Sequence, residues 1–156
     1  MRRSLLLCLL AAAGLACAPR LVLVERVIDG DTIVLADSAR VRYIGVDTPE
    51  SVHPRKSVQF MAKEASDFNR RLVEGRKVRL EYDVDRTDRY GRTLAYVYLD
   101  TLFVNAELVR QGYAQLLTIP PNVKYVDLFK ELQKEAREEN RGLWNAEAAA
   151  RWASGH

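Results

Sequence analysis

Cysteine and histidine are both scarce in this chain of 156 residues, which contains two of each. Cys8 and Cys17 both lie close to the N-terminus, and Cys8 falls in a segment that we expect to be removed. The mature chain would then have no intrachain disulfide, so its stability must come from a hydrophobic core. His53 has no second histidine near it and His156 is terminal, so we do not predict a histidine metal site.

Long hydrophobic runs are also missing, apart from Leu5–Leu15, which is too short to span a membrane comfortably. This run follows two arginines and precedes small residues, which is the layout of a secretory signal. We predict that residues 1–16 are a signal peptide and that the protein is exported, to the cell envelope or to the exterior. Gly14-Leu15-Ala16-Cys17 resembles a bacterial lipoprotein box, in which lipidated Cys17 would attach the mature protein to the membrane. Ordinary signal cleavage, which leaves Cys17 as a free cysteine, is the alternative.

Net charge is small as well, at +3 for the whole chain. Removal of Arg2 and Arg3 reduces the 24 basic residues to 22, against 21 acidic residues, and leaves a charge of +1. Non-specific coating of nucleic acid requires many phosphate contacts, so a nearly neutral protein is not expected to do this. A local basic site is still compatible with this charge. The length allows one domain with a core, with no sign of more than a monomer.

Short β-rich runs separated by turns predict five strands, at Leu21–Val27, Ile33–Leu35, Val41–Val46, Val78–Val84 and Leu94–Leu99. The first run lacks clean alternation, which indicates a strand buried on both faces of a curled sheet. Helical periodicity predicts three helices, at about Val58–Glu74, Ala106–Gln111 and Asn122–Asn140, with Asn105 capping the second. This order fits a mixed α+β fold, a five-stranded Greek-key barrel of the OB type with three helices, over residues 21–145. Residues 146–156 are expected to form a short helical or frayed tail.

The stretch Ile28–Glu50 carries two acidic clusters, Asp29 with Asp31 and Asp47 with Glu50. The two β-branched runs between them can pair as a hairpin around residues 36–40, which would bring both clusters to one end of a sheet. Arg42 lies on the second run. A hard cation and a phosphate need such a combination of carboxylates and arginine, so we predict a metal-dependent phosphodiesterase site. D-G-D-T alone would more simply be a polar turn, in which Gly30 supplies a bend or a positive φ.

A second group of arginines lies in the polar loop Asp85–Arg92. Such a loop is usually only a solvated surface. Arg92, however, comes just before the apolar strand Leu94–Leu99, so the sheet would hold it in place. Arg92 is therefore a better candidate for a fixed role than Arg86 or Arg89.

Several motifs together resemble the thermonuclease (staphylococcal nuclease) family: I-D-G-D-T, R-Y-I-G-V-D-T-P-E, H-P-R-K, R-T-D-R-Y-G-R-T-L-A-Y-V-Y and N-x-x-L-V-R-Q-G-Y-A. They occur in order between about Val24 and Trp144. The resemblance implies an OB-fold, calcium-dependent nuclease, extracellular or in the envelope, that cleaves DNA and RNA to leave 3′-phosphate and 5′-hydroxyl ends. Oxygen ligands alone leave Ca²⁺, Mg²⁺ and Mn²⁺ open.

The resemblance also implies roles for individual residues. Asp31 and Asp47 match the family's calcium carboxylates, and the backbone carbonyl of Thr48 matches its third protein ligand. Glu50 matches the general base. Arg42 and Arg92 match the arginines that bind the scissile phosphate, and Tyr90 and Lys56 are candidates for further substrate contacts.

The chain departs from the family pattern after Gly112, where family enzymes carry two tyrosines that stack on the substrate base and reach its terminal phosphate. The aligned positions are interpreted as Thr118 and Pro120. Stacking on an aromatic side chain is worth about 1–3 kcal/mol per base, so its loss should weaken substrate binding without affecting the chemistry. The alternative function is a catalytically inactive OB module that binds an oligonucleotide or a protein partner. Relatives of that kind lose the carboxylate or arginine positions, which this chain retains.

Overall fold

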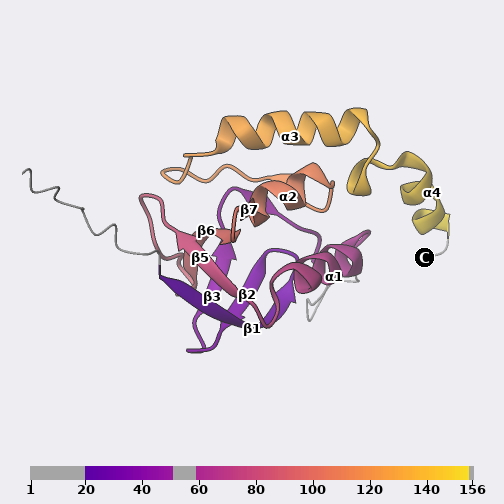
Figure 1. The fold of residues 1–156 in the computed structure, drawn as a ribbon. Helices are drawn as coiled ribbons and strands as arrows, with labels where there is room; N and C mark the ends of the chain where they lie inside the picture. Colours follow the sequence, from indigo (N-terminus) through magenta and orange to yellow (C-terminus); the bar gives the residue numbers. More distant parts are fainter. Residues whose placement is uncertain (1–19, 51–58, 155–156) are drawn as a thin grey trace, which may run out of the picture.

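The structure is a computed structural model that describes residues 20–50 and 59–154. Five strands form its barrel: β1 (Leu21–Asp29), β2 (Thr32–Leu35), β3 (Arg40–Tyr43), β5 (Lys77–Glu81) and β6 (Thr93–Leu99). Their order in the sheet is β3-β2-β1-β5-β6, and a parallel pairing of β3 with β6 closes it. The predicted mixed α+β fold with a five-stranded OB-type barrel is confirmed (Figure 1).

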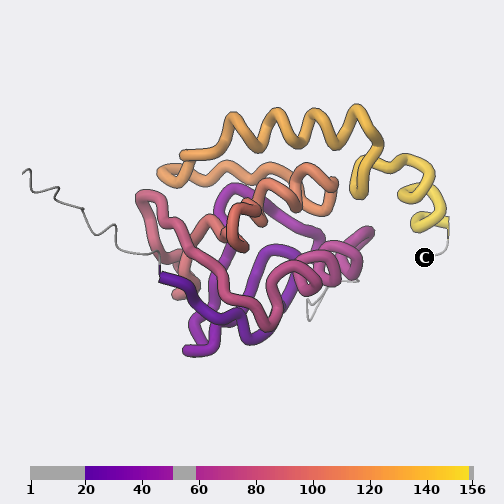
Figure 2. The backbone as a smooth tube through the Cα atoms, viewed as in Figure 1, coloured from indigo at the N-terminus to yellow at the C-terminus, as the bar shows by residue number. Residues whose placement is uncertain are grey.

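The described ranges contain four α-helices rather than the three predicted: α1 (Ala62–Val73), α2 (Val104–Arg110), α3 (Val126–Glu138) and α4 (Ala146–Ser154). The short 3-10 helix η1 (Gly142–Trp144) joins α3 to α4. α2 packs on β6 and on α3, so it lies between the barrel and the long outer helix (Figure 2). The predicted C-terminal tail is therefore helical over Ala146–Ser154. None of the helices in the described part is long and apolar enough to cross a membrane.

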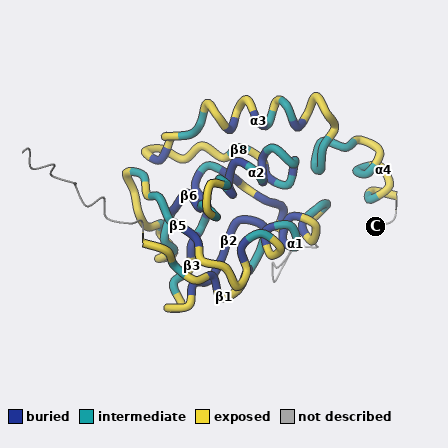
Figure 3. Tube along the Cα trace, viewed as in Figure 1, coloured by how far each residue is buried: buried dark blue, intermediate teal, exposed yellow. Residues whose placement is uncertain are grey.

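The core fills the barrel and continues beneath α2 and α3 (Figure 3). Its largest fully buried side chains include Tyr43, Tyr96 and Phe129. The expectation that the first strand is buried on both faces is wrong, because only Val24 and Val27 of β1 are buried. The β1–β2 register is irregular after each of these residues, between Val24 and Arg26 and between Val27 and Asp29, which explains why the strand shows no clean alternation.

Predicted Val41–Val46 is two strands, because the chain bends at Gly45 with φ 81°. A side chain there would collide with the ring of Phe129, so glycine is required on two counts. Beyond the bend, β4 (Val46–Asp47) pairs with β8 (Gln115–Leu116), and β7 (Leu102–Phe103) extends the main sheet beside β6.

Asn105 does not cap α2 as predicted; it lies inside the helix and is fully buried. Its side-chain amide donates to the carbonyl of Ile44 at 2.9 Å and accepts from Val97 N–H at 2.9 Å. These bonds join β3, β6 and α2 at the point where the chain leaves β3 for β4. Asn105 therefore helps to fix the direction in which the second acidic cluster is presented.

Candidate active site

The β2–β3 hairpin brings the two acidic clusters to one rim of the barrel, as the sequence predicted. Thr32 pairs with Arg42 across the hairpin, so Asp31, which immediately precedes β2, lies next to Arg42. The backbone carbonyl of Asp31 also accepts a hydrogen bond of 2.9 Å from Tyr43 N–H. Asp47, on β4, reaches the same rim because the chain turns back at Gly45.

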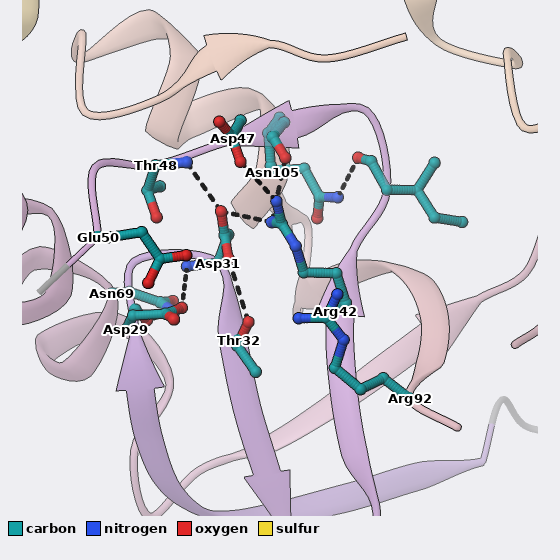
Figure 4. Close-up of polar contacts among 12 residues, drawn as sticks. Asp29, Asp31, Thr32, Arg42, Asp47, Thr48, Glu50, Asn69, Arg92 and Asn105 are labelled. Carbon is teal, nitrogen blue, oxygen red and sulfur yellow. Dashed lines mark hydrogen bonds and ion pairs between the residues drawn. The ribbon is translucent and has the colours of Figure 1, made fainter. Parts of the chain in front are cut away.

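Arg42 lies between Asp31 and Asp47 and binds both (Figure 4). Its Nη1 forms an ion pair with Asp31 Oδ2 and donates to the carbonyl of Val46 at 3.1 Å. Its Nη2 is 2.7 Å from Asp47 Oδ1. The side chains of Arg42 and Asp31 are 13% and 6% exposed, whereas that of Asp47 is 57% exposed. The Arg42 guanidinium therefore binds one buried carboxylate, Asp31, and one exposed carboxylate, Asp47.

Both carboxylate oxygens of Asp31 are held by hydrogen bonds. Thr48 N–H donates to Oδ2 at 2.8 Å, and the hydroxyl of Thr32 donates to Oδ1 at 3.1 Å. Burial nevertheless raises the pKa of Asp31 to about 6, against the lowering effect of Arg42 and with a further rise from the charge of Asp29. Burial likewise raises the pKa of Asp47, and the neighbouring Asp31 charge adds to the rise that Arg42 opposes. The Arg42 guanidinium thus binds two carboxylates, and Asp29 adds a third negative charge beside Asp31.

The turn at Gly30 is fixed by close packing, not by the positive φ that was one of two possibilities, because Gly30 is not among the glycines with positive φ. A Cβ atom on Gly30 would lie 2.7 Å from Cγ2 of Thr48. Any larger residue would displace Thr48, and with it the N–H group that binds Asp31. Glycine is therefore needed so that the two acidic turns can meet.

Helix α1 supports the same turn from inside the molecule. Asn69 is fully buried on α1; it accepts a hydrogen bond of 3.0 Å from the Tyr43 hydroxyl. Its amide nitrogen lies 3.4 Å from the carbonyl oxygen of Asp29, to which it donates. Burial raises the pKa of Tyr43, so the hydroxyl remains a donor. The position of the Asp29–Asp31 turn is thus tied to the helix.

Arg92, immediately before β6, is held by Asp88. Its Nε donates to Asp88 Oδ2 at 2.7 Å, and its backbone N–H donates to Asp88 Oδ1 at 3.0 Å. Partial burial acts to raise the pKa of Asp88, but these hydrogen bonds outweigh it and the pKa is lowered. Because Nε is engaged, the two terminal nitrogens of Arg92 are the ones available to a ligand. Figure 4 shows them directed toward the Arg42 side chain.

A cavity of about 530 Å³ opens beside the two arginines. Its lining combines Arg42 and Arg92 with Tyr90, whose side chain is highly exposed. The rest includes an apolar segment made by Leu117, Ile119, Pro120 and Pro121. The cavity therefore joins positive charge to apolar and aromatic surface.

This cavity is related to the two positions, Thr118 and Pro120, that were interpreted as aligned with the family tyrosines. Pro120 lines it, but Thr118 is not among its lining residues, whereas its neighbours Leu117 and Ile119 are. Side chains alternate along an extended segment, so neighbouring residues face opposite sides of the chain. The hydrogen bond of 3.0 Å from Leu117 N–H to the Gly45 carbonyl sets which face turns inward.

Glu50 is exposed, and its side chain points toward Asp31 and Asp29 (Figure 4). Its backbone N–H donates to Oε1 of Gln59 at 2.8 Å. No described residue forms a hydrogen bond or ion pair with the Glu50 carboxylate. Lys56, the other predicted substrate contact, lies outside the described residues, so its role stays a prediction.

The residues at the rim fit a hard divalent cation. Within residues 20–50 and 59–154, no group of three or more histidine, cysteine or acidic side chains is placed to hold a metal. The predicted ligand set contains only two such side chains, Asp31 and Asp47, with the backbone carbonyl of Thr48. Such an all-oxygen set is compatible with a hard cation such as Ca²⁺, which takes six to eight oxygen ligands and would complete them with water and substrate oxygens.

Sequence reasoning missed the residues that hold the site in place. Asp88 could have been found from its position four residues before Arg92, across a turn that contains Gly91 with φ 77°. Asn69 lies four residues after Ala65 and four before Val73, so it shares the buried face of α1 with them, and a polar residue on an apolar helix face is itself a signal. Gln59 offered no such signal, because nothing in its spacing relates it to Glu50.

Comparison with known proteins agrees with this geometry. Residues 40–146 match the family described as staphylococcal nuclease homologue. The chain is 47% identical over 125 residues to the thermonuclease of Staphylococcus intermedius, an alignment that covers 78% of this chain and 74% of that protein. It is 46% identical over 125 residues to the thermonuclease of Staphylococcus hyicus, with the same coverage of each. It is also 41% identical over 129 residues to endonuclease YncB of Bacillus subtilis (strain 168), covering 80% of this chain and 61% of that protein.

Proposed function

Because this chain belongs to the staphylococcal nuclease family, we propose that it is a calcium-dependent nuclease that hydrolyses DNA and RNA to 3′-phosphate and 5′-hydroxyl ends. The names of its relatives, thermonuclease and endonuclease, support the reaction class. The observation that carries the proposal is the position of Arg42, which binds two carboxylates at the barrel rim and also lines the cavity that contains Arg92.

The two arginines would bind and stabilise the phosphate. Charge builds up on the phosphoryl oxygens when phosphorus becomes five-coordinate, and preorganised positive groups stabilise that state more than the ground state. An arginine fork meets two phosphate oxygens at once and does not lose its proton. For that reason neither Arg42 nor Arg92 is assigned as a general acid. Asp88 keeps Arg92 in position through the side-chain and backbone bonds described above.

Calcium, held by Asp31, Asp47 and the carbonyl of Thr48, would supply further positive charge beside the phosphate. Glu50 would take the proton from the attacking water, a contribution of roughly 10²–10⁴ in rate. Its exposure favours this role, because a general base must reach water. Asp31, in contrast, is fixed and buried, as suits a ligand.

The cavity would hold the nucleoside next to the bound phosphate. Tyr90 offers an aromatic face, and the segment from Leu117 to Pro121 offers an apolar wall without tyrosine. Apolar contact with a base does not depend on its hydrogen-bonding edge, so this wall favours binding with little base preference.

Export, attachment to the membrane through Cys17 and a monomeric state are proposed from the sequence alone. Residues 1–16 would be removed as a signal peptide. Mass spectrometry of the mature protein isolated from its cells would distinguish a diacylated Cys17 from a free cysteine.

Incubation of the purified protein with single-stranded DNA or RNA, with Ca²⁺ or with a chelator, tests the proposed function. Cleavage in Ca²⁺ alone, with products that carry a 3′-phosphate and a 5′-hydroxyl by mass spectrometry, is expected. The matched control is Asp31→Asn, which keeps the shape of the buried side chain but removes its charge. Binding of the oligonucleotide without cleavage would instead favour the inactive OB module.

A further inference from the structure

Glu50 and Gln59 are joined by two hydrogen bonds, although eight residues separate them in the sequence. Glu50 N–H donates to the side-chain Oε1 of Gln59 at 2.8 Å, and Gln59 N–H donates to the backbone carbonyl of Glu50 at 3.3 Å. Both backbone polar groups of Glu50 are therefore bound by one residue. Among the described residues, the Glu50 carboxylate has no hydrogen-bond or ion-pair partner. The two backbone bonds therefore set the position from which the Glu50 side chain extends.

Gln59 is itself tied to the start of α1. Ala62 N–H donates to the carbonyl of Gln59 at 3.1 Å, and Ala65 N–H donates to the carbonyl of Met61 at 2.9 Å. Met61 has φ 64°, so the chain turns sharply between Gln59 and the helix. Ala62 and Ala65 are both fully buried. The turn is thus anchored in the core and can hold Gln59 in a defined place.

The C-terminal helix α4 reaches the same segment. The ring of Trp152 on α4 lies 6.0 Å from the ring of Phe60, with an interplanar angle of 55°. Phe60 follows Gln59 directly and is half-buried. α4 also packs on η1, which ties it to the body of the protein. In Figure 1, α4 lies at the right-hand end of the molecule, beyond α1.

We propose that Gln59 is a positioning residue for Glu50 and that α4 supports it through the contact of Trp152 with Phe60. This rests on the proposed function, in which Glu50 is the general base. Asp31 is held by its own side-chain bonds within the core, whereas Glu50 is exposed and depends on its backbone for position. The side chain of Gln59 holds the Glu50 backbone in place, as Thr32 and Thr48 hold the Asp31 carboxylate.

Steady-state kinetics of Gln59→Ala test the first part. Loss of one hydrogen bond, or a shift of the base by a fraction of an ångström, should lower kcat by about tenfold, with KM unchanged. Gln59→Glu keeps an oxygen acceptor for Glu50 N–H and should restore kcat to within about twofold of the wild type. Gln111→Ala is the matched control, because its amide bonds only Glu107 on α2 and its loss should leave kcat unchanged.

A double mutant separates positioning from general destabilisation. If Gln59 acts through Glu50, then Gln59→Ala should cause no further loss of kcat in a Glu50→Gln background. An equal loss in both backgrounds, or a rise in KM with kcat unchanged, would overturn the proposal.

Hydrogen exchange provides a readout that does not depend on activity. The backbone amide of Glu50, followed by NMR, should lose protection in Gln59→Ala and also in Trp152→Ala, but not in Gln111→Ala. Trp152→Ala should lower kcat by about two- to fivefold, the lower part of the range for loss of one aromatic pair, and Trp152→Phe should not. Unchanged protection of Glu50 in Trp152→Ala would overturn the role of α4, and unchanged protection in Gln59→Ala would overturn the whole inference. A wild type that cuts no nucleic acid but shows these exchange effects would contradict the proposed function and leave the contact established.

Discussion

Replacing Arg42 with methionine should strengthen calcium binding while it abolishes cleavage. In the structure the Arg42 guanidinium is bound to both Asp31 and Asp47, the two side chains assigned to calcium. A cation that enters the rim therefore competes with Arg42 or is repelled by it. Methionine fills a similar volume without charge, so Arg42→Met removes this competitor. It also removes the phosphate contact proposed for Arg42, which is why activity should be lost.

The size of the effect follows from distance and exposure. Two unit charges about 4 Å apart interact by about 4 kcal/mol at an effective dielectric constant of about 20. The side chain of Asp47 is 57% exposed, so water and salt screen much of this. A remaining difference of about 1.4 kcal/mol corresponds to a tenfold lower Kd for Ca²⁺. Without calcium, Asp31 would be buried without its partner, at a cost of about 3 kcal/mol in unfolding free energy.

Calorimetric titration and thermal unfolding, each with and without Ca²⁺, measure both quantities. Arg42→Met should unfold at a lower temperature than the wild type in chelator. It should recover more of its stability in calcium, since ligand at a hundred times Kd adds about 2.7 kcal/mol. Arg92→Met is the control, because it removes the same charge from the same cavity but from a side chain bound to Asp88. Calcium binding to Arg42→Met that is equal to or weaker than wild type would refute this reasoning.

Three further changes test other parts of the site. Glu50→Gln should lower kcat by roughly 10²–10⁴ with calcium affinity unchanged, and near wild-type turnover would remove Glu50 from the mechanism. Leu117→Tyr adds an aromatic face to the cavity and should lower KM with little change in kcat, whereas Thr118→Tyr should not. The opposite pattern in steady-state kinetics would show that Thr118, and not Leu117, faces the bound base. The folded-state pKa of Asp88 is lowered, so its bond to Arg92 stabilises the fold at neutral pH and is lost as the pH falls below the ordinary value of 3.8. Asp88→Asn should therefore lower the Tm at neutral pH but not in strong acid, and a difference that persists in acid would point to another cause.

Most of the barrel could be predicted because its strands are short β-branched runs between turn residues. Each of the five predicted strands overlaps an observed one, since the inward-facing residues of a barrel must be apolar. The strands β7 and β8 were missed, because two residues form no pattern that can be recognised. Helix α4 was left open between helix and frayed tail, because its sequence is rich in alanine and its packing on η1 and on Phe60 could not be predicted from the sequence.

The meeting of Asp31, Arg42 and Asp47 was also predictable, since a hairpin necessarily brings its flanking residues to one end. The side of the chain on which the Thr118 side chain lies could not be predicted from the sequence. Its position depends on how β8 pairs with β4 and on the bond from Leu117 N–H to the Gly45 carbonyl. Register of this kind is set by tertiary contacts and is lost with a slip of one residue.

The contrast between Asp31 and Glu50 explains why the site needs two kinds of support. A carboxylate that binds a cation can be buried, because the cation replaces the lost water and the fold can fix its oxygens with donors such as Thr48 N–H. A general base has to remain in contact with water, so the core cannot surround it. Its position must then be set through the backbone, by a residue outside the barrel, and Gln59 has the bonds to do this. The precision of the proposed base, Glu50, would thus depend on α1 and α4, elements to which we assign no catalytic side chain.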